Sequence, residues 1–247
     1  MDLDISYPSL TKAFDAIDTA EGLQAVAPSH AVNLLIDATF FGRSYGYLCF
    51  HDTKRIIWFR EIRTEGVKHL RQGLHELQEA GFRIKSITID GRRGYYQAIR
   101  KLMGGVPIQM CLYHQKAIVR RYITDKPKSQ CGQELRELMK SLCSAEQSDF
   151  IDRFYQLFYK HRSFLEERNW KREYKHQALR AAFRSLQDNL PQLFTCKDMP
   201  YLNIPPTINH LEGTFSHLKE KINIHRGLNQ QRKKNAIKFI LNSIPDF

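Results

Sequence analysis

The stretch LLIDATFFG, residues 34–42, places a carboxylate directly after an apolar run. Residues 34–36 are wholly apolar and favour a buried central strand, and two aromatic residues, Phe40 and Phe41, follow shortly afterwards. A buried charge is costly unless a partner compensates it. We therefore expect Asp37 to end this strand at a functional position.

The sequence around this stretch predicts a mixed α/β sheet. Two further strand-like runs follow at 45–52 and 55–62, rich in aromatic and β-branched residues and joined by a turn. Over residues 66–80 the apolar residues recur with the spacing of one helical face. Later segments alternate as a strand (84–90), a helix (95–103), a short strand (106–111) and a basic helix (113–123). Three strands followed by such alternation favour a mixed sheet with helices on its faces.

The pattern divides the chain into four parts. Residues 1–30 form a short, weakly patterned segment, with a candidate helix in SLTKAFDAI (residues 9–17). Residues 31–129 form the first part of the α/β core. Residues 130–200 are interpreted as a helical segment, and residues 201–247 as a C-terminal helical segment.

Composition narrows the class of protein. The 247 residues carry 38 Lys and Arg against 26 Asp and Glu, a formal net charge of +12. Such a balance favours a polyanionic partner, most often nucleic acid, although a basic protein that is merely soluble fits as well. No apolar run approaches the roughly 20 residues of a membrane span. The start lacks a signal-peptide pattern, and five scattered cysteines do not form a disulfide framework. We expect an intracellular, reduced protein.

Three acidic residues are candidates for chemistry. Asp37 and Asp90 are each expected to end an apolar strand, and neighbouring strands would direct both carboxylates into one crevice. Such paired charges repel each other, and divalent cations relieve the repulsion. Glu212 lies at the edge of an apolar helical stripe. Each has a plain alternative: a helix N-cap for Asp37, a turn for Asp90 and a solvated side chain for Glu212. The stripe comprises Ile208, Leu211, Phe215, Leu218 and Ile222.

Four segments together resemble the DDE transposases of the Mutator-like and related bacterial insertion-sequence groups. They are LLIDATFFG (34–42), ITIDGRRGYYQAI (87–99), QMCLYHQ (109–115) and TINHLEGTFSHLKEKINIHRGL (207–228). The resemblance implies a ribonuclease-H-like fold with a helical insertion before the last catalytic helix. It also implies that Asp37, Asp90 and Glu212 hold two Mg²⁺ or Mn²⁺ ions, which suit oxygen ligands.

The Cys111-x-x-His114 pair is half of a zinc site in spacing, but no second pair with suitable spacing accompanies it. The resemblance implies that His114 contacts the scissile phosphate or orients a ligand, while Cys111 packs nearby. Asn209, one turn from Glu212, is expected to pack in the same motif. A plain core histidine is the alternative for His114.

Aromatic and basic residues are candidates for DNA contacts. The resemblance implies that Trp170, in the helical insertion, stacks on a DNA base, with core packing as the alternative. Trp58 is assigned to the core. The basic candidates for phosphate contacts are Arg92, Arg93, Arg120, Arg121, Lys219 and Arg226, with further clusters at 126–128 and 232–234.

The leading interpretation is a DNA transposase catalytic domain that cleaves and joins transposon ends. The alternatives are a structure-selective nuclease of the same fold and a transposase-derived DNA-binding protein without catalysis. The expected partners are transposon-end and target DNA, with a homodimer or higher oligomer on DNA and no membrane. The expected location is the bacterial cytoplasm, on the nucleoid. Relatives usually carry an N-terminal module that recognises transposon ends. We expect this module to be absent, truncated or separately encoded, or its role to pass to the insertion.

Overall fold

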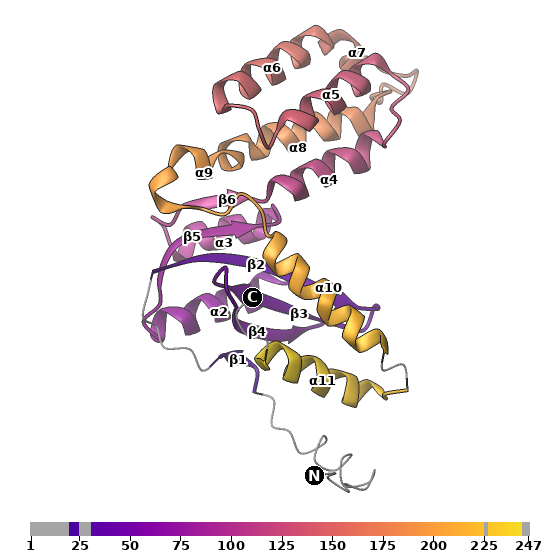
Figure 1. Ribbon diagram of the computed structural model, residues 1–247. Coiled ribbons are helices and arrows are strands. Elements are labelled where there is room, and N and C mark those ends of the chain that lie inside the picture. The colour runs from indigo at the N-terminus through magenta and orange to yellow at the C-terminus, as the bar shows by residue number, and fades with distance from the viewer. Residues whose placement is uncertain (1–19, 25–30, 225–226, 244–247) are drawn as a thin grey trace, which may run out of the picture. The chain divides into compact units, whose positions relative to one another are not determined.

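The computed structural model describes residues 20–24, 31–224 and 227–243. The helix expected within residues 9–17 lies outside these ranges. The chain divides into two compact units. The first unit comprises Met1–Lys85, Gln97–Gly104 and Ile208–Phe247, and the second comprises Ser86–Tyr96 and Gly105–Thr207. Figure 1 labels the helices and strands of both units.

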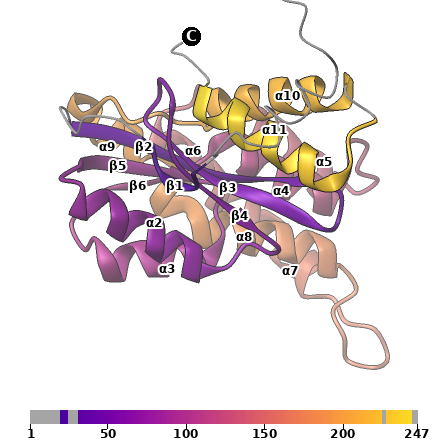
Figure 2. The same ribbon diagram turned by 90° about the horizontal axis from the view of Figure 1, so that it is seen from below.

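The strands form a mixed sheet. In the first unit, β2 (Ala31–Phe41), β3 (Tyr45–His51) and β4 (Ile56–Ile62) make an antiparallel meander, and β1 (Gly22–Leu23) pairs with β4. The strands β5 (Arg83–Ile89) and β6 (Ile108–Met110) pair in parallel. The strand order is β1-β4-β3-β2-β5-β6. The predicted fold class, a mixed α/β sheet with flanking helices, is confirmed (Figure 2).

Helices cover both faces of the meander in the first unit. Figure 2 shows α2 (Val67–Glu79) on one side of β2, β3 and β4, and α10 (Asn209–Ile224) and α11 (Gln230–Ser243) on the other. Every residue of β3 is buried as a result. The α2 helix approaches closely because Gly73 has no side chain: an added Cβ would lie 2.6 Å from the Phe50 ring. The helix gives way to a turn in which Gly81 has a φ of +82°.

The assignment of Trp58 to the core is confirmed. Its side chain is fully buried, and its ring centroid lies 4.6 Å from that of Phe50. The indole Nε1–H donates to Glu76 Oε2 at 2.6 Å, which satisfies the one polar atom of the ring. Glu76 also pairs with Arg60 at 3.0 Å. The buried indole is therefore linked through Glu76 to the Arg60 guanidinium.

The second unit is mainly helical. Helix α3 (Arg93–Leu102) begins in it and ends in the first unit. Five further helices share one apolar core, in which Phe150, Phe154, Phe183 and Phe194 are buried. These helices are α4 (Leu112–Ile123), α5 (Gln130–Ser141), α6 (Gln147–Lys160), α7 (Arg162–Glu166) and α8 (Gln177–Leu193). The short helix α9 (Thr195–Asp198) and the 3₁₀ turn η1 (Pro200–Leu202) follow them.

Two expectations about local structure were wrong. Asp37 does not end its strand, because β2 continues to Phe41 and pairs with β3 along this length before Gly42 turns at a φ of +68°. Residues 130–200 are not helical throughout either. Helix α7 ends at Glu166 and α8 begins at Gln177, so Trp170 lies in a loop. Within the described ranges, none of the helices is both long and apolar enough for a membrane crossing.

Candidate metal centre and nucleic-acid interface

Asp37 lies in the middle of β2, on the face of the sheet that α10 covers. Its Oδ1 accepts a hydrogen bond from the backbone N–H of Ala38 at 2.8 Å. Directly across the ladder is Cys49, which is fully buried. Burial, followed by the negative charge of Asp37, raises the pKa of the Cys49 thiol well above its ordinary value. The neighbour of Asp37 across the strand therefore remains an uncharged thiol.

Glu212 lies in the first turn of α10. The five apolar residues of its stripe are all buried, which confirms the predicted helical face. Glu212 is half-buried beside them, as expected for the edge of a stripe. Its position near the helix N-terminus favours a carboxylate, because unpaired N–H groups and the helix dipole are positive there.

The first unit brings these two acidic side chains together. Asp37 and Glu212 each offer a carboxylate oxygen, and these atoms lie within 4.8 Å of each other. Two like charges at this distance repel by about 1–3 kcal/mol at the effective dielectric of a partly exposed site. A divalent cation between two half-buried carboxylates would replace this repulsion with attraction, and carboxylate oxygens are the ligands that Mg²⁺ prefers. The pair therefore fits the predicted metal.

Asp90 lies in the second unit, at the end of β5. Its Oδ1 accepts from the backbone N–H of Arg92 at 3.1 Å, so the side chain also closes a turn. Gly91 has a φ of +86°, and an added Cβ would lie 2.1 Å from the Met110 side chain. The Asp-Gly sequence is therefore required by backbone geometry and close packing. This local role does not use both oxygens of the Asp90 carboxylate.

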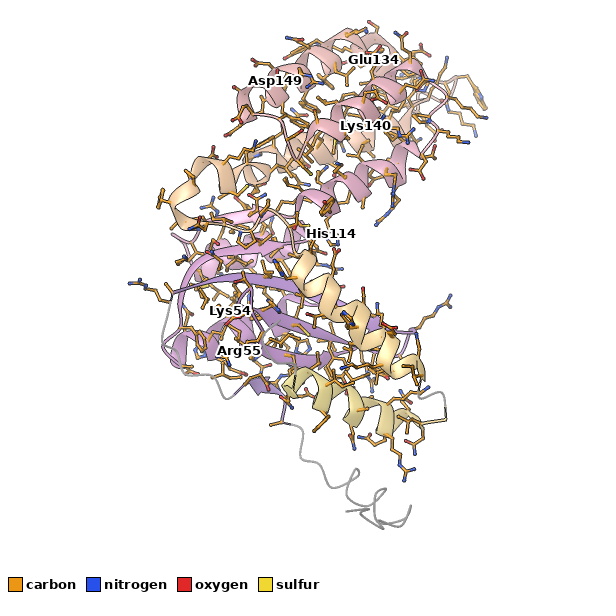
Figure 3. All side chains as sticks on the ribbon, in the orientation of Figure 1. Lys54, Arg55, His114, Glu134, Lys140 and Asp149 are labelled. Atoms are coloured by element: carbon orange, nitrogen blue, oxygen red, sulfur yellow. The ribbon has the colours of Figure 1, made fainter. Side chains whose placement is uncertain are left out.

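The Cys-x-x-His motif follows β6 in the second unit. Cys111 is fully buried immediately before α4, and its N–H donates to Ile89 O at 2.8 Å. This bond places the motif beside the end of β5, where Asp90 follows. His114 lies in the first turn of α4 and is half-buried. Figure 3 labels His114. The structure thus places Asp90 and the motif at one edge of the second unit.

Two proline residues anchor the chain just before α10, a role that the sequence did not indicate. The carbonyl of Pro205 accepts from Thr88 Oγ1 at 2.8 Å, and that of Pro206 accepts from the N–H of Leu112 at 3.1 Å. A proline has no N–H, so its position in a sequence predicts only an interrupted helix. Their carbonyls nevertheless tie this segment to β5 and α4 within the second unit.

Trp170 is exposed rather than buried: 87% of its surface is accessible, which excludes core packing. The Lys171 ammonium lies 4.9 Å from its ring centroid. Asn169 holds the turn, because its Oδ1 accepts from the N–H groups of Lys171 and Glu173 at 2.9 and 3.0 Å. At the base of the loop, Arg168 lies over the Tyr174 ring at 3.8 Å. A turn stabilised by Asn169 therefore exposes the Trp170 ring next to basic side chains.

The predicted phosphate contacts lie at several places. Arg92 is exposed, with its guanidinium 5.8 Å from the Tyr95 ring centroid. Arg120 and Arg121 are exposed in the last turn of α4, and Lys219 is exposed on α10. The Arg93 side chain and Arg226 lie outside the described part of the chain. Asn209 is exposed at the first residue of α10, whereas Cys111 is fully buried.

No protein-family model matches the sequence, and no curated protein matches it. Among solved structures, the chain is similar to the Drosophila P element transposase strand transfer complex, with a TM-score of 0.47 and 11% sequence identity. The alignment covers 96% of this chain and 85% of that chain.

Proposed function

We propose that this protein is a metal-dependent DNA transposase catalytic domain of the DDE type, within the Mutator-like or related insertion-sequence groups. The observation that carries the proposal is the carboxylate pair of Asp37 and Glu212. These residues come from motifs 175 positions apart (212 − 37 = 175), yet their oxygens lie within 4.8 Å of each other. Both belong to the sequence segments that resemble this group.

In the proposed site, Asp37 and Glu212 hold metal through their carboxylate oxygens, and Asp90 supplies the third carboxylate. His114 is a further side chain that could offer a ligand atom. Because Mg²⁺ prefers oxygen ligands, we assign His114 instead to the scissile phosphate or to the orientation of a ligand. Its place in the first turn of α4, beside a buried Cys111, supports a fixed ring position.

Two Mg²⁺ or Mn²⁺ ions, when bound, would activate the attacking oxygen and stabilise the leaving oxygen of an in-line displacement at phosphorus. The residues of the chain would hold the DNA in position for this reaction. Trp170 would stack on an unpaired base, and Arg92, Arg93, Arg120, Arg121, Lys219 and Arg226 would contact phosphates. Transposon-end and target DNA are the proposed substrates. A homodimer or higher oligomer would bring two ends together in the bacterial cytoplasm, on the nucleoid.

The test is a strand-transfer assay on labelled DNA that carries the inverted repeats flanking the coding region. With Mg²⁺, we expect cut ends and joined products, and with EDTA neither. Asp37→Asn, Asp90→Asn and Glu212→Gln should each abolish both products while DNA binding persists. Cutting without joining would instead identify a nuclease. Binding without either reaction would identify a non-catalytic DNA-binding protein, and both results would contradict the proposal.

A further inference from the structure

A second feature of the first unit is a groove of about 450 Å³ beside the C-terminal end of β2 and the C-terminal half of α10. Phe41, Ser44 and Tyr45 line it from the turn between β2 and β3. Lys219 and Asn223 line it from α10, and Lys233 lines it from α11. The volume lies within the range of roughly 300–1,000 Å³ that is usual for ligand sites.

The charge of the groove is positive and uncompensated. On α11, Lys234 pairs with Glu61 at 2.5 Å and Lys238 pairs with Glu21 at 2.6 Å. Lys219 and Lys233, by contrast, make no ion pair within the part of the chain that the structure describes, and the lining described there includes no carboxylate. The two lysines of the groove are therefore available to an anion.

The walls of the groove are ordered by aromatic contacts. The Phe41 and Tyr45 rings stack with centroids 5.7 Å apart and planes 15° from parallel. The Lys234 ammonium lies 5.0 Å from the Tyr45 ring centroid. The Ser44 hydroxyl and the Asn223 amide add hydrogen-bonding groups to the lining. This combination of cations, polar groups and aromatic rings suits a phosphate and the nucleoside attached to it.

The residue spacing along β2 and α10 gives the distance from the groove to the carboxylate pair. Phe41 follows Asp37 by four residues on β2 (41 − 37 = 4), about 13 Å along a strand. Lys219 follows Glu212 by seven residues on α10 (219 − 212 = 7), about 10 Å along the same side of a helix. Both paths begin at the carboxylate pair and end at the groove. The separation corresponds to about three or four nucleotides at a rise of about 3.4 Å each.

We propose that this groove binds a phosphodiester unit of the DNA strand whose reacting phosphate lies at the Asp37–Glu212 pair, which deepens the proposed function and rests on it. Lys219 and Lys233 hold the phosphate oxygens, and the groove sets how far the strand extends beyond the reacting position. The alignment of groove and carboxylates along β2 and α10 favours a continuous strand over an isolated small anion.

A charge-matched pair of variants tests this proposal. The first carries Lys219→Gln and Lys233→Gln. The control carries Lys221→Gln and Lys68→Gln, which removes two exposed lysines that do not line the groove. Anisotropy in EDTA measures the affinity for a labelled single-stranded oligonucleotide. We expect the groove variant to lose at least tenfold and the control less than twofold. The log–log salt slope of the groove variant should fall in magnitude by about 0.7 for each single-strand phosphate that the two lysines neutralise.

A scan with neutral methylphosphonate linkages then locates the contact. One or two positions should weaken binding of the unaltered protein and have no further effect on the groove variant. Equal losses in both double variants, or the absence of such a position, would overturn the groove assignment. Asp37→Asn should abolish cleavage and leave the scan unchanged. If Asp37→Asn still cleaves while the scan locates the contact, the groove stands and the proposed catalytic function fails.

Discussion

Asp37 on β2 and Glu212 on α10 place carboxylate oxygens within 4.8 Å of each other, although the first lies in a strand and the second in a helix near the other end of the chain. Both side chains are half-buried, so solvent screens their repulsion only in part. Nothing in the packing of two apolar faces requires a charge at either position. A divalent cation bound between the two carboxylates would relieve this repulsion, and the resulting gain in folding stability can be measured.

Replacement of Asp37 by Asn should remove one charged ligand of the proposed metal with little change in side-chain volume. Mn²⁺ should stabilise the unaltered protein by about 2.7 kcal/mol at one hundred times its dissociation constant and stabilise Asp37→Asn much less. Thermal melts with EDTA and with Mn²⁺ measure both effects.

The matched control for this prediction is Asp152→Asn, which removes an exposed carboxylate on α6. Its melting temperature should change little in EDTA, and its response to Mn²⁺ should equal that of the unaltered protein. An equal response to Mn²⁺ in Asp37→Asn would show that the ion binds elsewhere, and the metal role of the pair would be lost.

The spacing of apolar residues predicts the helical face beside which Glu212 lies, but it does not predict where the strand that carries Asp37 ends. The stripe on α10 has the spacing of one helical face, and a helix forms its hydrogen bonds locally, so the pattern determines the face. The end of a strand depends on its partners instead. The pairing of Phe40 and Phe41 with the start of β3 extends β2 beyond Asp37, and a single-strand pattern does not contain this information.

The loop around Trp170 is a second segment whose structure the sequence pattern does not predict. Residues 167–176 are rich in charged side chains that are common in helices, so their composition predicts a helix. The competing interaction is the Asn169 side chain, which bonds to the backbone N–H groups that follow it and stabilises a turn. Exposure of Trp170 follows from this turn and could not be derived from composition.

Replacement of His114 by Ala should slow cleavage about 10²–10⁴-fold, the usual contribution of a positioned histidine, with a much smaller change in DNA affinity. The protein should also purify without stoichiometric zinc, since Cys111 and His114 supply only two of four tetrahedral ligands. Single-turnover kinetics, filter binding and elemental analysis check these points. One zinc per chain, lost on Cys111→Ser, would show that the motif is structural.

The folding stability of the protein should decrease at low pH because of His51. Burial lowers the pKa of His51 to about 4, from an ordinary value of 6.5, and its Nδ1 accepts from the N–H of Thr53 at 3.0 Å. Between these two values the unfolded chain takes up a proton and the folded chain does not. The contribution of the neutral His51 to folding stability is therefore fully present above pH 6.5. It is lost as the pH falls towards 4, by up to about 3 kcal/mol.

Urea unfolding at pH 7.5 and pH 4.5 measures this loss. His51→Asn, which retains an acceptor for Thr53, should show a smaller loss than the unaltered protein, whatever its stability at pH 7.5. His75→Asn, on the exposed side of α2, should show the full loss. If His51→Asn loses as much stability with acid as His75→Asn, the pH dependence arises elsewhere.

The two tryptophans of the chain should respond in opposite ways to truncation. Trp170→Ala should leave the melting temperature nearly unchanged, because the ring is 87% exposed, and should weaken binding to DNA with an unpaired end base by about 1–3 kcal/mol. Trp170→Phe should bind more tightly than Trp170→Ala, since a flat aromatic face remains. Trp58→Ala should instead cost about 3–5 kcal/mol of folding stability, because its ring is fully buried and its Nε1–H bonds to Glu76. Melting curves of the free variants and binding isotherms with duplex and end-unpaired DNA separate the two effects. Equal affinity of Trp170→Ala and the unaltered protein for the end-unpaired DNA would exclude stacking by this residue and leave the loop without a DNA role.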